Sequence, residues 1–151
     1  MSATELTARL PALIDDYARD LHRSGRVSTQ PAARVEAERQ TAQLLADGVD
    51  TADTLLFVAE DEGRSVGWIW IGVPSTANGG DSAWVYQVLV DAGERGKGYG
   101  RAIMRAAEQE LARRGMTRIA LNVFAGNTAA IQLYESLGFR VTAQLMAKKI
   151  G

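Results

Sequence analysis

The segment 85–101 constrains the fold of this chain more than any other. It reads VYQVLVDAGERGKGYGR: an apolar run, a glycine-rich turn and the start of a helical pattern. The run predicts a strand, and the apolar spacing after Gly100 predicts a helix. Amides at a helix N-terminus, together with the helix dipole, favour an anion, and glycine lets the backbone approach it closely. The segment therefore predicts a cradle for a pyrophosphate.

Two common phosphate-binding loops do not fit this turn. A Walker loop beginning at Gly93 would reach its second glycine at Gly98, but Tyr99 follows where a lysine is needed. A dinucleotide fingerprint needs G-x-G-x-x-G, whereas Gly96, Gly98 and Gly100 alternate. The pattern that remains is Arg95-x-x-Gly98-x-Gly100. The alternative to an anion-binding loop is a tight surface turn that binds no ligand.

A second pattern follows the first along the chain. Residues 116–124 are rich in β-formers and predict a strand, after which Asn127 is placed to cap a helix. Gly138 predicts the end of that helix, and residues 139–141 predict the start of another strand. Asn127, Ala130, Tyr134, Gly138 and Phe139 form the spacing N-x-x-A-x-x-x-Y-x-x-x-G-F.

These two patterns resemble the acyl-CoA loop and the second motif of the GNAT superfamily of N-acyltransferases, in the superfamily's order, over residues 65–149. The resemblance implies an α/β fold: a mixed, mostly antiparallel sheet flanked by helices, with splayed central strands. It also implies a single domain over 1–151, with a helical acceptor-side region at 1–50 and a sheet and acyl-CoA core at 54–149. Acetyl-CoA would be the co-substrate.

The first sixty residues resemble the superfamily less. Residues 6–21 place apolar side chains on one helical face, and Pro11 is expected either to break this helix or to begin a separate one. Pro31 suits the first turn of a second helix that ends near Asp47 and Gly48. By the resemblance, helices in this region form one wall of the acceptor site.

Two further strands are expected at 54–60 and 65–73, and a loop at 74–81. In the second strand Trp68 and Trp70 alternate onto the side opposite Ile69 and Ile71. We interpret the tryptophans, Trp84 included, as packing residues. The alternative is that one of them lines an apolar acceptor pocket.

The resemblance assigns the donor site to a strand, a turn and a helix start. The strand would offer backbone groups to the pantetheine arm, and an amide near Val90 would polarise the carbonyl. The turn would hold the pyrophosphate, with Asn127 contacting the cofactor or capping its helix. The residues implied are Val88, Leu89, Val90, Arg95, Gly96, Lys97, Gly98, Tyr99, Gly100, Arg101 and Asn127.

Tyr134 matches the tyrosine of the second motif, and the resemblance makes it the catalytic acid for the leaving thiolate. The alternative is a half-buried helix tyrosine packed on the sheet. No general base is assigned, because the strand at 84–88 has no carboxylate. Asp81 and Asp91 flank that strand, and Tyr86, Gln87 or Asn122 could position a water that relays the proton.

Composition narrows the function further. A net charge of −1 argues against nucleic acid as a partner, and the absence of cysteine excludes a thiol nucleophile and a disulfide framework. The lone His22 has no ligand cluster around it, so no metal is expected. Apolar runs are only strand-length and no secretory signal is seen, so we expect no membrane association and a cytoplasmic location.

The sequence thus predicts an N-acetyltransferase that moves the acetyl group of acetyl-CoA to a primary amine by direct attack in a ternary complex. The acceptor would be a small-molecule or peptide amine of unknown identity. Whether the protein forms a homodimer is left open by the sequence. One alternative is a catalytically silent module that binds or senses acyl-CoA. Another, a toxin-like enzyme acting on aminoacyl-tRNA, would need a basic face that the composition does not suggest.

Overall fold

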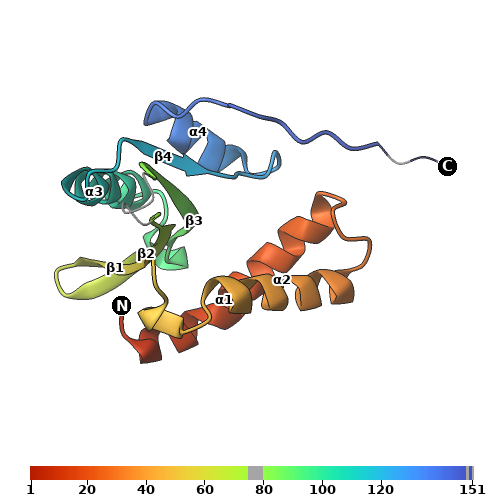
Figure 1. Ribbon diagram of the computed structural model, residues 1–151, viewed down its shortest axis with the longest axis horizontal. Coiled ribbons are helices and arrows are strands. Elements are labelled where there is room, and N and C mark those ends of the chain that lie inside the picture. Colours follow the sequence, from red (N-terminus) through yellow and green to blue (C-terminus); the bar gives the residue numbers. More distant parts are fainter. Residues whose placement is uncertain (75–79, 149, 151) are drawn as a thin grey trace. The chain divides into compact units, whose positions relative to one another are not determined.

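The computed structural model describes residues 1–74, 80–148 and 150 (Figure 1). The chain forms two compact units: Met1–Ala3 with Asp47–Asn122, and Thr4–Ala46 with Val123–Gly151. The elements follow in the order α1 (Ala3–Arg23), α2 (Gln30–Leu44), η1 (Gly48–Asp50), β1 (Thr54–Asp61), β2 (Arg64–Gly72), β3 (Ser82–Val90), η3 (Ala92–Glu94), α3 (Tyr99–Arg113), β4 (Arg118–Leu121) and α4 (Thr128–Ser136).

The first unit contains a four-stranded sheet in the order β1-β2-β3-β4. The β1–β2 and β2–β3 pairs are antiparallel and the β3–β4 pair is parallel, which confirms the predicted mixed, mostly antiparallel sheet. A two-residue turn joins β1 to β2, and Glu62 and Gly63 there have φ angles of 50° and 76°. Two positive φ angles suit the tight hairpin turns that match strand twist. Residues 75–79 of the expected loop lie outside the described residues.

Helix α3 packs on one face of this sheet, with Ile103, Met104, Ala107 and Leu111 buried. Gly67 permits the close approach, because a Cβ there would lie 3.1 Å from Ile103 Cδ1 and 2.3 Å from Leu89 O. Trp68 and Trp70 alternate onto the opposite face and are 2% and 3% exposed, which confirms that they are packing residues. Trp84 differs from them, since 41% of it is exposed.

The parallel pairing of β3 with β4 is short. It runs from Ser82 opposite Arg118 to Val85 opposite Leu121, while β3 continues to Val90. The two central strands therefore separate beyond Val85, as predicted. Strand β4 is shorter than the predicted 116–124: it begins at Arg118, whose amide bonds to Asp81 O together with that of Thr117, and it ends at Leu121.

The prediction of a strand beginning at 139–141 is wrong. Residues 139–148 form no helix or strand in the structure. Pro11 also departs from expectation: it neither breaks nor begins a helix, and α1 continues through it to Arg23. Its long amphipathic face, with Leu6, Leu13, Ala18 and Leu21 buried, is continuous on both sides of the proline.

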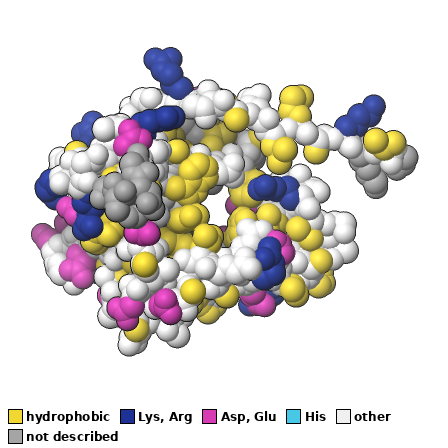
Figure 2. All heavy atoms as spheres, in the orientation of Figure 1, with side chains coloured by type: hydrophobic (Ala, Val, Ile, Leu, Met, Phe, Trp, Pro, Cys, Tyr) yellow, Lys and Arg dark blue, Asp and Glu magenta, His cyan; other side chains and the backbone are white. Residues whose placement is uncertain are grey.

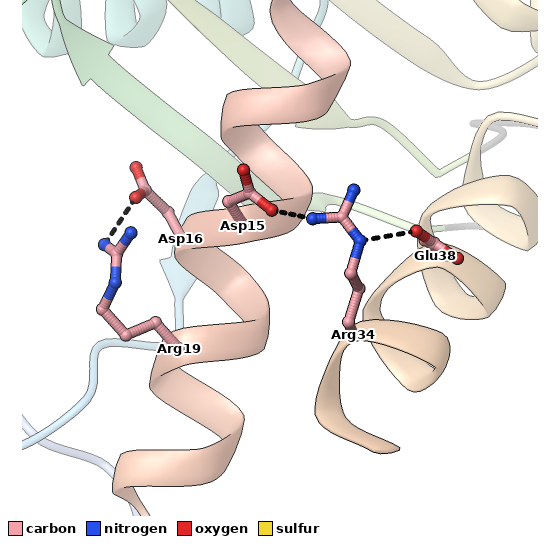
Figure 3. Close-up of polar contacts among 5 residues, drawn as sticks. All are labelled: Asp15, Asp16, Arg19, Arg34 and Glu38. Carbon is pink, nitrogen blue, oxygen red and sulfur yellow. Dashed lines mark hydrogen bonds and ion pairs between the residues drawn. The ribbon is translucent and has the colours of Figure 1, made fainter. Parts of the chain in front are cut away.

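In the second unit α1 packs against α2. Ala18, Leu21, Ala33 and Ala37 form a buried cluster, and the small alanines let the two helices come close. Thr29 caps α2 by accepting a hydrogen bond from the Ala32 amide, with Pro31 in the first turn as predicted. Arg34 of α2 bonds to Asp15 of α1 and to Glu38 of its own helix (Figure 3). These exposed pairs contribute little stability, so the apolar cluster holds the helices together.

We expect Ala37→Leu to destabilise the second unit. Ala37 is 0% exposed, so a larger side chain must force the helices apart, at a cost of about 1–3 kcal/mol in the free energy of unfolding. Urea denaturation followed by far-UV circular dichroism measures this cost. Ala42→Leu is the matched control, because Ala42 is exposed on the same helix. Equal stability of the two variants would contradict the packing described.

Candidate functional site

The open edge of β3 is the first feature of the site. The Asp91 amide donates to Val66 O at 3.0 Å, and Val90 lies opposite Gly67 in the antiparallel register. Groups in such a ladder point alternately to either side, so the amides and carbonyls of Val88 and Val90 face away from β2. Strand β4 has already ended its pairing at Val85. Backbone donors and acceptors therefore line this edge without a neighbouring strand.

A bulge precedes the open edge. Trp70 pairs with Gln87 and Ile71 with Val85, so Tyr86 is the extra residue in β3. Its ring packs against Trp70 with 4.7 Å between centroids and covers Gly72, where a Cβ would lie 2.7 Å from Tyr86 Cε2. The bulge brings Trp70, Tyr86 and Gly72 together on one face of the sheet, and bulges commonly redirect side chains next to functional sites.

The glycine-rich turn leads from this edge to α3. Gly96 and Gly98 have φ angles of 77° and 88°, which favour glycine over any residue with a Cβ. Gly98 is the N-cap of α3 and no side chain caps the helix. A Cβ at Gly96 or Gly98 would meet nothing within 4 Å, so the space beside the turn is open. Uncapped amides facing open space fit an anion such as a pyrophosphate.

Arg95 and Lys97, the two cations of the turn, already have partners in the protein. Arg95 Nε donates to Val90 O at 3.2 Å, and Lys97 Nζ lies 2.9 Å from Glu94 Oε2. The hydrogen bond from Lys97 holds the pKa of the Glu94 carboxyl below its usual range. For Lys97 to reach a phosphate it must leave Glu94, so the backbone is better placed than these side chains to bind an anion.

The β1–β2 turn fixes the start of α3, which sequence reasoning missed. Tyr99 Oη donates to Asp61 Oδ2 at 2.5 Å, and this hydrogen bond raises the pKa of the Tyr99 phenol. Arg64, at the other end of the same turn, lies 3.8 Å from Glu94. Asp61 is far from Tyr99 in the sequence, so their hydrogen bond could not be predicted. The sequence indicated only the short turn at Glu62 and Gly63, which brings the end of β1 beside the start of β2.

The two carboxylates that flank β3 have structural partners. Asp81 accepts a hydrogen bond from the Thr117 hydroxyl and holds the entry to β4. Asp91 Oδ2 accepts from Ser65 Oγ at 3.0 Å. Gln87 is half-buried and Tyr86 is 39% exposed, so both remain candidates to position a water. The general base stays unassigned.

The second unit carries the other two predicted site residues. Asn127 Oδ1 accepts a hydrogen bond from the Ala130 amide at 3.2 Å, which confirms the expected cap of α4. The helix ends as predicted at Gly138, where φ is 93°. Tyr134 is half-buried with its ring 5.6 Å from Phe139, and burial raises the pKa of its phenol. That Asn127 and Tyr134 meet the glycine-rich turn stays a prediction.

Two negative findings concern the described residues. No three His, Asp or Glu side chains among them gather in a way that could hold a metal ion. Within 1–74, 80–148 and 150, no helix has both the length and the apolar character needed to cross a membrane.

Comparison with known proteins matches residues 12–139 to the acetyltransferase (GNAT) family. The chain is 31% identical to YycN, an uncharacterized N-acetyltransferase of Bacillus subtilis, over 78% of this chain and 76% of that protein. The YycN crystal structure aligns with a TM-score of 0.91 over 99% of this chain and 95% of its own, at 29% identity. A mycothiol acetyltransferase of Thermobispora bispora is 45% identical over 62% of this chain. This chain spans only 32% of that protein's length.

We expect Gly100→Val to weaken acetyl-CoA binding at least roughly tenfold, or about 1.4 kcal/mol. Gly100 lies in the first turn of α3 with ordinary helical backbone, so valine adds bulk beside the anion site without the strain that it would meet at Gly98. Isothermal titration calorimetry measures the affinity.

Ala112→Val is the matched control for Gly100→Val, because Ala112 is exposed in the last turn of the same helix. It should bind acetyl-CoA as the wild type does. Normal binding by the Gly100 variant would mean that the glycine-rich segment is only a turn.

Proposed function

Because the chain belongs to the acetyltransferase (GNAT) family, we propose that it transfers the acetyl group of acetyl-CoA to a primary amine by direct attack in a ternary complex. The observation that carries this proposal is the open edge of β3, which leads directly into the uncapped N-terminus of α3. The acceptor in this proposal is a small-molecule or peptide amine, and the reaction takes place in the cytoplasm.

The residues of the first unit fit an acyl-CoA in two places. The outward groups of Val88 and Val90 suit an arm that carries its own amides, because such an arm can pair with them as a further strand would. The open space at Gly96 and Gly98 suits the pyrophosphate at the helix N-terminus. Arg95 Nε, now on Val90 O, would then share that carbonyl or turn toward a phosphate.

Each step of the transfer needs a group on the protein or on the substrate. The amine nitrogen attacks the thioester carbon, and the Val90 amide stabilises the negative charge that develops on the carbonyl oxygen. The carbon–sulfur bond then breaks, and Tyr134 donates its proton to the leaving thiolate. Burial raises the pKa of Tyr134, so the phenol remains protonated at neutral pH as an acid must.

Strand β3 contains no carboxylate that could remove the proton from the attacking amine. A water held by Tyr86, Gln87 or Asn122 would carry the proton away in our proposal. Holding both reactants together supplies much of the rate without a strong base, through effective concentration. The acceptor amine then has to enter in its neutral form, and this makes the rate depend on its own pKa.

The acceptor is the least constrained part of the proposal. The Thermobispora bispora relative is named a mycothiol acetyltransferase, but this chain spans only 32% of its length. A screen of amines, polyamines, aminoglycosides, amino acids and peptides, following thiol release from acetyl-CoA, would test the proposed function. A protein that binds acetyl-CoA and acetylates nothing in a broad screen would instead be the silent acyl-CoA-binding module.

We expect Tyr134→Phe to lower kcat by about 10²–10⁴, the usual contribution of a positioned acid. Phenylalanine retains the ring contact with Phe139 and removes only the proton donor. Acetyl-CoA affinity, measured by calorimetry, should stay unchanged. Gln132→Ala, on the exposed side of the same helix, should retain full turnover. Full turnover by the Tyr134 variant would remove this residue from the mechanism.

The pH dependence of kcat/KM should reflect the acceptor rather than a carboxylate. A primary amine with a pKa of about 10 is neutral in only a small fraction at pH 7, so log kcat/KM should rise with pH up to that pKa. Burial raises the pKa of Tyr134, so loss of its proton should reduce the rate only at a pH above the ordinary pKa of a tyrosine phenol. A plateau beginning near pH 6 would instead reveal a protein base that our assignment lacks.

A further inference from the structure

The segment that joins β3 to α3 contacts the β1–β2 hairpin at three points, all within the first unit. Three pairs make these contacts: Ser65 Oγ donates to Asp91 Oδ2 at 3.0 Å, the Arg64 guanidinium lies 3.8 Å from the Glu94 carboxylate, and Tyr99 Oη donates to Asp61 Oδ2 at 2.5 Å. Asp91 is the first residue after β3, Glu94 lies in η3, and Tyr99 is the first residue of α3. The beginning, middle and end of the segment are thus each connected to one hairpin.

The hairpin is a firm support for these contacts. Asp61 and Arg64 are direct partners in the antiparallel β1–β2 register, which continues to Thr54 opposite Gly72. Side chains of directly opposed residues lie close together on the same side of a sheet. One backbone ladder therefore fixes the positions of both Asp61 and Arg64 beside the segment.

The segment needs such support because it is rich in glycine. Gly93, Gly96 and Gly98 lie within positions 91–99, and glycine loses more conformational entropy than any other residue when it is fixed. Tyr99 follows Gly98 directly, and its amide is among the first-turn amides that have no partner within the helix. The side chain of Tyr99 is therefore placed to hold the backbone that would bind an anion.

We propose that Asp61 and Tyr99 are positioning residues for the co-substrate: through their hydrogen bond, Asp61 holds the first turn of α3 in the geometry that binds the pyrophosphate of acetyl-CoA. This inference rests on the proposed function. A turn that is already ordered loses less conformational entropy on binding, so the hydrogen bond increases the affinity for acetyl-CoA. The β1–β2 hairpin then belongs to the co-substrate site through its support of the turn.

Charge alone predicts the opposite effect of Asp61. Figure 2 shows acidic and basic side chains next to one another on the left of the view, where Figure 1 places the β1–β2 hairpin and α3. Asp61 brings a carboxylate to the first residue of a helix whose N-terminus would bind an anion, and like charges repel. If charge dominated, removal of this carboxylate would tighten the binding of acetyl-CoA. If positioning dominates, the same removal weakens binding, because hydrogen bonds to charged acceptors are among the strong ones.

Calorimetric titration with acetyl-CoA separates these two effects by their sign. Asp61→Ala should raise the Kd of acetyl-CoA roughly fivefold to tenfold, a fraction of what a hydrogen bond to a charged group contributes to stability. Tyr99→Phe should raise the Kd by a similar factor. The double variant should bind no more weakly than either single variant, because both changes break the same hydrogen bond. Asp61→Asn retains an acceptor oxygen and should bind nearly as the wild type does.

Glu60→Ala is the matched control for Asp61→Ala. Glu60 is exposed in β1 next to Asp61, so this variant removes the same charge from the adjacent position and leaves the Tyr99 hydrogen bond intact. It should bind acetyl-CoA as the wild type does or slightly more tightly. Every variant should retain the wild-type far-UV spectrum, because none of the altered side chains is buried.

Binding of S-acetylpantetheine shows whether the effect is confined to the pyrophosphate. This donor has the acetyl group and the amide-bearing arm of acetyl-CoA but no pyrophosphate. Its Kd, measured by NMR titration, should be the same in the wild type, Asp61→Ala and Tyr99→Phe.

Two results would overturn this proposal and leave the proposed function standing. The first is unchanged or tighter binding of acetyl-CoA by both Asp61→Ala and Tyr99→Phe. The second is an equal loss of affinity for acetyl-CoA and S-acetylpantetheine, since a general disturbance of the fold would then explain the loss. A wild type that binds neither donor would overturn the proposed function, and this proposal with it.

Discussion

The early end of the β3–β4 pairing is the constraint on which the site depends. Because the two strands part after Val85 and Leu121, the backbone groups of Val88 and Val90 face an edge with no neighbouring strand. The same strand then turns through Gly96 and Gly98 into the uncapped start of α3. Along this path the chain offers first an open strand edge and then a helix N-terminus. An amide-bearing arm can pair with the strand edge, and a pyrophosphate can bind at the helix N-terminus.

Side-chain contacts hold this path in shape before any ligand binds. Tyr99 is tied to Asp61, Glu94 lies between Lys97 and Arg64, and Arg95 donates to Val90 O. Lys97 and Arg64 are exposed, so the effect of their pairs with Glu94 on stability is small. Their effect on binding is larger, because a turn that is already ordered loses less conformational entropy when it closes on a ligand.

Local signals predicted the elements that bear the site, whereas contacts between distant residues were not predictable. Strand β3, the start of α3 and the Asn127 cap each follow from a few adjacent residues. The Tyr99–Asp61 hydrogen bond joins two segments whose proximity only the folded sheet creates. The segment predicted as a strand at 139–141 has the right alternation, yet the described residues there form no strand, and Pro11 was overridden by the continuous buried face of α1. The periodicity of apolar residues predicts which element a segment can form. Strand pairing or side-chain packing in the folded protein decides whether that element forms.

Backbone amide exchange at the open edge, followed by NMR with and without acetyl-CoA, tests the central claim most directly. If the edge of β3 and the start of α3 bind the co-substrate, the amides of Val88 and Val90 should become protected and those of residues 96–100 should shift. Leu89, whose amide is directed to β2, is the internal reference and should change least. Acetyl-CoA binding that left Val88, Val90 and the turn unchanged would contradict this account.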